Sequence, residues 1–317
     1  NEAQYLLGLK PLFNRNEVGI DIKVKELYPY INQLPNVKNG VPEALLELSE
    51  IMTAVHPNDA KAFAIYADIL YYTGNPMEAL TQYHKTLELD NSVYSVWEQV
   101  LIVNETLGRF DEVIKMSENA MDYFPNQAFI FYMNGMGYNR TGDYEDAIDA
   151  LEQAMMMSGS DEVMKAKIHS ELGVSYFGDK DIKRSNKNFE AALALDANNL
   201  SALNNYSYYL ALQGNDLAKA EKLIKKADNL APNQATIQDT YGFILYKSKK
   251  YNDAEKWFRK ALDNGGNMNY VILEHYGDVL YQLNRTDEAV TYWQKAKKLG
   301  STSKKLDKKI AERKIFE

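Results

Sequence analysis

The chain has no cysteine among its 317 residues, which narrows the chemistry that it can carry out. Without thiols it can form neither disulfide bonds nor thiolate metal sites, and it lacks a cysteine nucleophile. Long hydrophobic runs are missing as well. The longest uncharged stretch, residues 197–215, contains five Asn and two Ser, so we expect no membrane span. No signal peptide is recognisable, and because the chain starts at Asn1 without Met we expect a mature or excised form.

Motifs that carry catalysis are also absent. The chain contains no HExxH, GxSxG, GxGxxG or GxxxxGK sequence. The four histidines lie far apart, and only His275 has carboxylates beside it on one expected helix, at Glu274 and Asp278. That trio could form a weak cation site, but a solvated or peptide-contacting face is the favoured interpretation. The sequence therefore predicts no enzyme, no catalytic residue, no cofactor and no metal.

The charge balance argues against nucleic acid as a partner. The net charge is −8, although residues 295–317 carry nine Lys or Arg and three acidic residues. The remainder of the chain therefore has a net charge of −14 and would repel phosphate backbones. We interpret the basic end as a solvated helix that covers the last apolar face.

A spacing of about 34 residues recurs along most of the chain. It is clearest in the C-terminal half, where the pattern is Tyr241-Gly242, Leu245, Ala254, Phe258 and Ala261. Aligned on this pattern, small residues dominate places 8 and 27 of each unit, and a bulky residue stands at place 24. Seven units can be aligned in this way, spanning residues 60–93, 94–127, 128–161, 166–199, 200–234, 235–268 and 270–303.

Each unit is expected to be a hairpin of two helices. Small side chains let two helices approach closely, so places 8 and 27 mark the line where the pair packs. Place 15 is glycine in four units, as expected for the left-handed residue after a helix: Gly74, Gly108, Gly142 and Gly214. Pro125 and Pro232 then end the second helix of their units, because proline has no N–H.

This pattern resembles the tetratricopeptide repeat (TPR) over roughly residues 60–303. The resemblance implies an all-α, right-handed superhelical solenoid of helix-turn-helix repeats, and it is favoured over a helical bundle with chance periodicity. Several places depart from the pattern: Leu101, Val113, Lys180, Ser185 and Lys249. We expect looser packing there, without a change of fold.

The two ends of the chain are expected to be atypical. Residues 1–59 are predicted to form a degenerate helical repeat region, with helices at Glu2–Leu9, at Ile22–Leu34 with an interruption near Pro29, and at Pro42–Val55, and with a long connection at Leu34–Val41. Residues 304–317 are predicted to form a capping helix. In that cap Leu306, Ile310 and Ile315 should face inward and the lysines outward.

Helical geometry predicts which side chains line the concave face. At 100° per residue, places 2, 5, 9, 12 and 13 of the first helix of each unit share one face, which in TPR proteins receives partner segments. That face is rich in aromatic, methionine and amide side chains, as interfaces are. The predicted partner-binding residues are Tyr71, Tyr72, Tyr132, Met136, Asn139, Arg140, Asn204, Tyr208, Asp239, Phe243, Tyr246, Glu274, Asp278 and Tyr281.

Two features of this face indicate what kind of partner to expect. It lacks the Lys/Asn/Arg set with which chaperone-binding TPR domains hold a C-terminal carboxylate. The acidic residues Asp239, Glu274 and Asp278 instead predict a preference for a basic or amine-bearing stretch. The alternative is that many of the aromatic side chains only pack against neighbouring helices.

A narrower resemblance concerns residues 203–309. Segments such as DTYGFILYKSKKYNDAEKWFRKAL resemble the C-terminal repeats of long TPR proteins of Gram-negative bacteria, many of which are exported or lipoproteins. The resemblance implies a scaffold in the periplasm or at the outer membrane, and a cytoplasmic location is the alternative. We therefore expect a non-enzymatic scaffold that binds segments of other proteins in a cell-envelope complex. A self-associating structural oligomer, or a subunit of an enzyme whose activity resides in a partner, are the alternatives, and the oligomeric state stays open.

Overall fold

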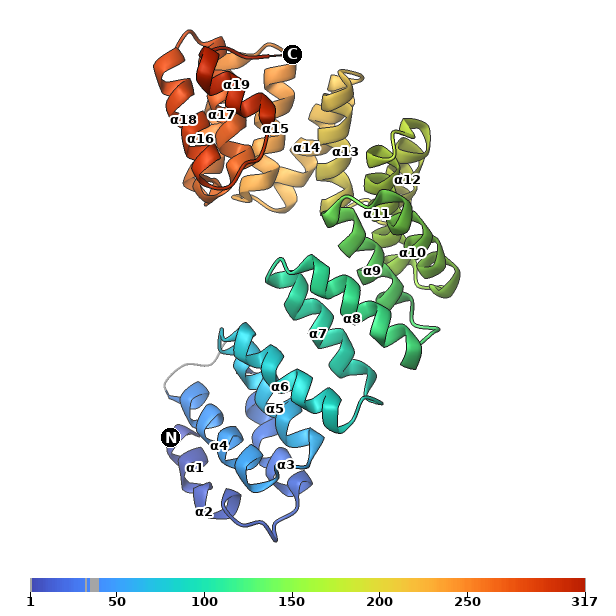
Figure 1. Ribbon diagram of the computed structural model, residues 1–317, viewed down its shortest axis with the longest axis vertical. Helices are drawn as coiled ribbons and strands as arrows, with labels where there is room; N and C mark the ends of the chain where they lie inside the picture. Colours follow the sequence, from blue (N-terminus) through green and yellow to red (C-terminus); the bar gives the residue numbers. More distant parts are fainter. Residues whose placement is uncertain (1, 32, 35–39, 317) are drawn as a thin grey trace. The chain divides into compact units, whose positions relative to one another are not determined.

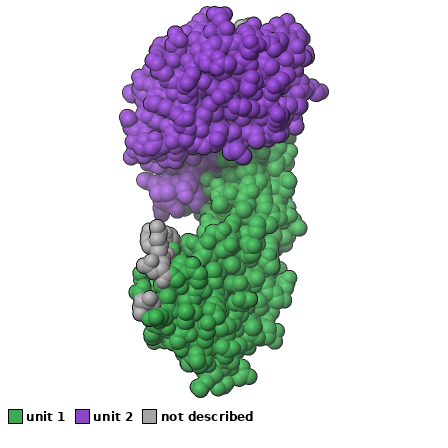
Figure 2. Space-filling view, turned by 90° about the vertical axis from the view of Figure 1, so that its left-hand side faces the viewer, with its two compact units in different colours: residues 1–159 green, residues 160–317 purple. Residues whose placement is uncertain are grey.

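The structure is a computed structural model that describes residues 2–31, 33–34 and 40–316. Within these ranges the regular structure is helical, and no β-strand occurs. The chain divides into two compact units, residues 1–159 and residues 160–317, which are coloured separately in Figure 2. Each unit is described here by itself.

Unit 1 begins with helices of unequal length and continues with three helical hairpins (Figure 1). Each hairpin pairs two successive helices that pack against each other. The helices are α1 (Glu2–Gly8), α2 (Lys10–Phe13), α3 (Ile20–Ile31), α4 (Val41–Val55), α5 (Ala60–Tyr72), α6 (Pro76–Leu89), α7 (Tyr94–Thr106), α8 (Phe110–Tyr123), α9 (Ala128–Thr141) and α10 (Tyr144–Met157).

Unit 2 contains four more hairpins and a last short helix (Figure 1). Its helices are α11 (Glu162–Gly178), α12 (Ile182–Leu195), α13 (Leu200–Gln213), α14 (Leu217–Leu230), α15 (Ala235–Lys247), α16 (Tyr251–Asp263), the 3₁₀ turn η2 (Gly266–Met268), α17 (Tyr270–Gln282), α18 (Thr286–Lys298) and α19 (Lys304–Glu312). The fold is thus all-α and built as a solenoid of repeated helical hairpins. We propose that the seven predicted repeat units correspond to the pairs from α5/α6 to α17/α18.

Glycine at place 8 packs directly under the bulky residue at place 24 of the same hairpin. A Cβ atom on Gly173 would lie 2.7 Å from the ring of Phe189, and one on Gly277 would lie 2.5 Å from the ring of Trp293. Both rings are buried. The two helices of these hairpins can therefore approach this closely only because place 8 carries no side chain.

The turn inside each hairpin uses the left-handed backbone conformation that ends many helices. Gly142 has φ 94° and Gly214 has φ 69°, as the sequence predicts. Lys180 (φ 67°) and Lys249 (φ 60°) adopt the same conformation although a Cβ makes it unfavourable. The turn geometry is thus kept where glycine is missing.

Two predicted boundaries differ from the structure. Helix α3 runs through Pro29 without the expected interruption, and it spans Ile20–Ile31 where the sequence predicts Ile22–Leu34. Helix α11 begins at Glu162, four residues before the predicted unit start at Ala166. The extra residues add a turn to the helix, and the Asp161 side chain caps it by accepting a hydrogen bond from the Met164 amide. Residues 35–39 of the predicted connection lie outside the described residues.

Helix α19 covers the end of unit 2 and packs against α18. Leu306 is fully buried, and Ile310 and Ile315 pack partly against the core of the unit. The prediction that the lysines of this helix all face outward is wrong for Lys309, which is 5% exposed. Its ammonium group reaches inward because two carboxylates of α17 receive it, as described below.

Candidate functional site

A cavity of about 740 Å³ lies in unit 2 and is called the unit-2 cavity below. Helices α13, α15 and α17 contribute most of its wall, and the C-terminal segment closes one side. The lining residues are Tyr208, Leu212, Phe243, Tyr246, Lys247, Lys249, Tyr251, Val271, Glu274, His275, Asp278, Gln282, Lys305, Lys309, Ile315 and Phe316.

Aromatic rings from successive hairpins form a continuous wall of this cavity. The ring centroids of Tyr208 and Phe243 are 5.2 Å apart, and those of Phe243 and His275 are 4.8 Å apart. Tyr246 continues the row toward Tyr251 at 5.7 Å. Tyr208 and Phe243 stand at place 9 of neighbouring units, so the 34-residue repeat itself brings their rings together. The wall offers large, rigid apolar area together with hydroxyl groups.

The acidic side of the cavity is neutralised by the chain itself. Lys309 Nζ lies 2.7 Å from Glu274 Oε1 and 2.8 Å from each carboxylate oxygen of Asp278. Trp293 Nε1 also donates to Asp278 Oδ1 at 2.9 Å. Burial lowers the pKa of Lys309, but the two carboxylates raise it more, so the amine stays protonated. Burial raises the pKa of Asp278, and Lys309 opposes that increase.

A second polar pair joins His275, a member of the aromatic wall, to Asp239. His275 Nδ1 lies 3.0 Å from Asp239 Oδ1, and the two side chains are 13% and 9% exposed. Burial lowers the pKa of His275, but the carboxylates of Asp239, Asp278 and Glu274 raise it above its ordinary value. When protonated, the imidazole neutralises Asp239, and the ring packs against Phe243.

The unit-2 cavity gathers five of the fourteen predicted partner-binding residues: Tyr208, Phe243, Tyr246, Glu274 and Asp278. Asn204 and Asp239 line a neighbouring depression of about 320 Å³, which shares Tyr208 with the cavity. Asp239 and Phe243 are buried, at 6% and 8% exposure, and Tyr281 is half-buried.

The six predicted residues of unit 1 are divided between surface and core. Tyr72 and Arg140 are exposed, and Tyr71 and Tyr132 are half-buried. Met136 and Asn139 are buried, against the prediction of an open face. The physical reason is that α9 packs tightly against α8 as well as α10, so little of its surface stays accessible.

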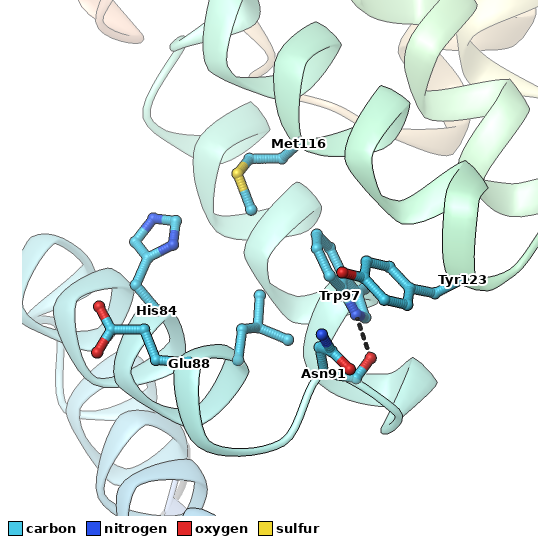
Figure 3. A pocket seen from close by; sticks show the side chains of 7 residues that line it. His84, Glu88, Asn91, Trp97, Met116 and Tyr123 are labelled. Carbon is cyan, nitrogen blue, oxygen red and sulfur yellow. Dashed lines mark hydrogen bonds between the residues drawn. The ribbon is translucent and has the colours of Figure 1, made fainter.

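Unit 1 also contains a shallow pocket that the sequence did not predict (Figure 3). Its volume is about 360 Å³, and it is lined by His84, Leu87, Glu88, Asn91, Trp97, Met116 and Tyr123. The rings of Trp97 and Tyr123 stack with centroids 5.6 Å apart, and Trp97 Nε1 donates to the Asn91 carbonyl oxygen at 2.9 Å. Burial lowers the pKa of His84, which favours a neutral imidazole. The pocket is thus weakly polar and lies mainly on the second helices, α6 and α8.

The side chains of the unit-2 cavity that are not among the fourteen predicted residues come from α13, α15 and α17, from a turn, from the start of α16 and from the C-terminal segment. Lys249 stands in a turn, Tyr251 begins α16, and Lys305 and Lys309 belong to α19. For Lys305 and Lys309 the sequence signal is the run of basic residues at the C-terminus, which by itself indicates a solvated helix. Ile315 had been expected to face inward, and it does contact the core of unit 2.

Over the residues that the structure describes, no group of three or more His, Asp or Glu side chains is arranged to hold a metal ion. In the same ranges no helix combines the length and the apolar character needed to cross a membrane.

Comparison with known proteins gives relatives but no matching family profile. The chain is 28% identical to the type IV pilus assembly protein PilF of Pseudomonas aeruginosa over 140 residues, which are 44% of the chain and 54% of PilF. It is 27% identical to the TPR repeat-containing protein PA4667 of the same organism over 158 residues, or 49% of the chain and 26% of that protein. The chain thus spans about half of PilF and about a quarter of PA4667.

A match of a different kind covers more of the chain. The chain is 23% identical to the human protein O-mannosyl-transferase TMTC3 over 247 residues. These residues are 76% of the chain but only 27% of that protein. This match covers a minor part of a much longer protein, so it does not decide whether the chain itself is an enzyme.

Among solved structures, a tetratricopeptide repeat protein from Parabacteroides merdae is similar in fold. The TM-score is 0.63 at 11% identity, and the match covers 80% of the chain and 98% of that protein. This likeness agrees with the repeated hairpins, the glycines packed under bulky residues and the left-handed turns described above. The chain therefore has the fold of the tetratricopeptide repeat proteins.

Proposed function

We propose that the chain is a non-enzymatic scaffold that binds an extended or helical segment of another protein in the unit-2 cavity. Proteins of this fold generally mediate protein–protein interactions through the concave surface of the stacked hairpins. The observation that carries the proposal is the aromatic wall formed by Tyr208, Phe243 and Tyr246, which faces a cavity of about 740 Å³. Tyrosine and phenylalanine supply contact area at a low cost in conformational entropy, and they are enriched among residues that dominate binding.

The proposal extends to the setting in which the scaffold acts. One relative is named as a type IV pilus assembly protein, and two relatives come from the Gram-negative bacterium Pseudomonas aeruginosa. We therefore propose that the chain assists the assembly of a bacterial cell-envelope complex, in the periplasm or at the outer membrane. Since only part of each relative is matched, the support comes from the repeats that they share with this chain.

Site-specific crosslinking tests the binding proposal. A photo-reactive phenylalanine derivative replaces Tyr246, which is half-buried in the cavity wall, and the full chain is then irradiated in its native cells. We expect crosslinks to a defined segment of a partner protein. The matched control places the same group at Tyr292, a half-buried tyrosine on the second helix α18 that does not line the cavity.

The pattern of crosslinks decides the result. Products that form from position 246 and not from position 292 support binding in the unit-2 cavity. Equal products from both positions, or products from position 292 alone, would show that the cavity is not the binding site. The melting temperature of each variant is measured first, because a loss of folding would expose both positions equally.

A further inference from the structure

The charged residues of the unit-2 cavity point to the chemistry of its ligand. The sequence alone predicts a basic partner from Asp239, Glu274 and Asp278, but in the structure each of these carboxylates already has a Lys or His nitrogen as its partner within the chain. Lys309 bridges Glu274 and Asp278, and His275 pairs with Asp239. An incoming amine would therefore have to displace a buried ion pair, which costs more than a surface pair would return.

Three other lysines of the cavity wall are exposed and carry their charge toward solvent. Lys247 ends α15, Lys249 occupies the following turn, and Lys305 lies in the first turn of α19. Among the described residues no ion pair to any of these three ammonium groups is found. The wall thus carries four lysines against two carboxylates, and one of those lysines already serves both carboxylates.

The three exposed lysines line the same cavity as the aromatic wall. Lys247 Nζ lies 5.9 Å from the centre of the Phe243 ring, and Lys249 lies between Tyr246 and Tyr251 in the chain. A ligand that contacts the rings would therefore reach the ammonium groups as well. Because the rings exclude water from one side, an ion pair formed there is screened less than one on an open surface.

We infer that the unit-2 cavity takes an acidic protein segment that also carries aromatic or large aliphatic side chains. Its apolar side chains pack on Tyr208, Phe243 and Tyr246, and its carboxylates pair with Lys247, Lys249 and Lys305. This inference rests on the proposed function and specifies the chemistry of the segment. The lysines stand at the end of a helix, in a turn and on the C-terminal helix, so they differ from the Lys/Asn/Arg set that grips a C-terminal carboxylate.

Selection from a random peptide library displayed on phage tests the inference with the full chain as bait. We expect the enriched peptides to combine Asp or Glu with Phe, Tyr, Trp or Leu. The affinity of a synthetic copy of such a peptide is then measured for Lys247→Glu/Lys249→Glu/Lys305→Glu. Reversing three charges should weaken binding by at least about ten-fold at low salt, and less at high salt.

A matched control keeps the net charge of the variant but leaves the cavity unchanged. Lys183→Glu/Lys187→Glu/Lys222→Glu changes three exposed lysines of α12 and α14 that do not line the cavity. We expect this control to retain the affinity of the unaltered chain within about two-fold, because distant exposed charges are largely screened. An equal loss in both variants would overturn the inference, since it would reflect net charge alone.

The remaining outcomes separate the inference from the proposed function. The enriched peptides could be basic or uncharged and bind the Tyr246→Ala variant more weakly than the unaltered chain. That result would overturn the acidic ligand but keep the cavity as the binding site. Peptides whose affinity is unaffected by Tyr246→Ala and by the charge reversal, or a failure to enrich any peptide, would overturn both. A single-stranded oligonucleotide that competes with the peptides and binds more tightly would also overturn the inference, because its phosphates would then be the preferred anions.

Discussion

Replacing Lys309 by methionine should destabilise unit 2 and detach helix α19. The side chain of Lys309 is 7% exposed and reaches two carboxylates at 2.7–2.8 Å. Removing one member of a fully buried ion pair costs about 3–5 kcal/mol, because the other member stays buried without a partner. Glu274 and Asp278 keep 19% and 16% side-chain exposure, so water can hydrate them in part. We therefore expect a loss of about 2 kcal/mol in the free energy of unfolding near neutral pH.

The loss of stability caused by Lys309→Met should become smaller as the pH falls. Burial already raises the pKa of Asp278, and without Lys309 that pKa rises further. A carboxylate whose pKa is higher in the folded state binds more protons when folded, so its presence penalises folding less as the pH falls. The difference between Lys309→Met and the unaltered chain should shrink from about pH 7 to about pH 4. Adding Asp278→Asn to the variant should recover part of the stability at neutral pH.

Urea unfolding followed by tryptophan fluorescence measures the free energy, and hydrogen exchange of residues 304–312 reports local detachment of α19. The matched control is Lys308→Met, since Lys308 is an exposed neighbour on the same helix. We expect that control to change stability by less than about 0.5 kcal/mol. Equal stability of the two variants, or a deficit that does not shrink at low pH, would refute the reasoning.

Three further predictions concern packing, the turns and the buried histidine. Gly173→Ala should cost about 1–3 kcal/mol in urea unfolding, whereas Gly8→Ala, where an added Cβ meets nothing within 4 Å, should not destabilise; equal effects would contradict the packing argument. Lys180→Gly should raise the free energy of unfolding by about 0.5 kcal/mol because it relieves a left-handed residue at φ 67°, and a loss of stability would count against this. In an NMR titration the His275 ring should titrate above pH 6.5, and Asp239→Asn should lower its pKa; an unchanged midpoint would show that the ion pair does not set it.

Much of the fold could be predicted because the repeat encodes local packing. Each hairpin brings place 8 and place 24 together over a short stretch of chain, so the glycine under Phe189 and the one under Trp293 follow from spacing alone. The left-handed turn at Gly142 is equally local. The prediction failed at α11, because an extra first turn with its own cap at Asp161 precedes the repeat pattern and moves the start of the helix by four residues.

The binding surface could be predicted only in part, since it depends on contacts between distant residues. The face of α15 and α17 could be located from helical periodicity, and Phe243, Tyr246 and Glu274 of that face line one cavity. Its charge could not, because Lys309 arrives from a helix 31–35 residues further along the chain. Amphipathic periodicity shows which way a side chain leaves a helix, but a lysine can bend its long stem toward a buried carboxylate. That contact, together with the exposed lysines of the cavity wall, is the reason why we propose an acidic partner segment instead of a basic one.

The most direct test of the central claim is hydrogen exchange of the full chain with and without a peptide selected by phage display. If the unit-2 cavity is the binding site, the peptide should slow exchange in residues 243–251 and 304–312, whose side chains form the lysine-bearing wall. Residues 84–97, which border the pocket of unit 1, should exchange at unchanged rates. Protection confined to unit 1, or protection of the second helices of unit 2 without residues 243–251, would contradict the account.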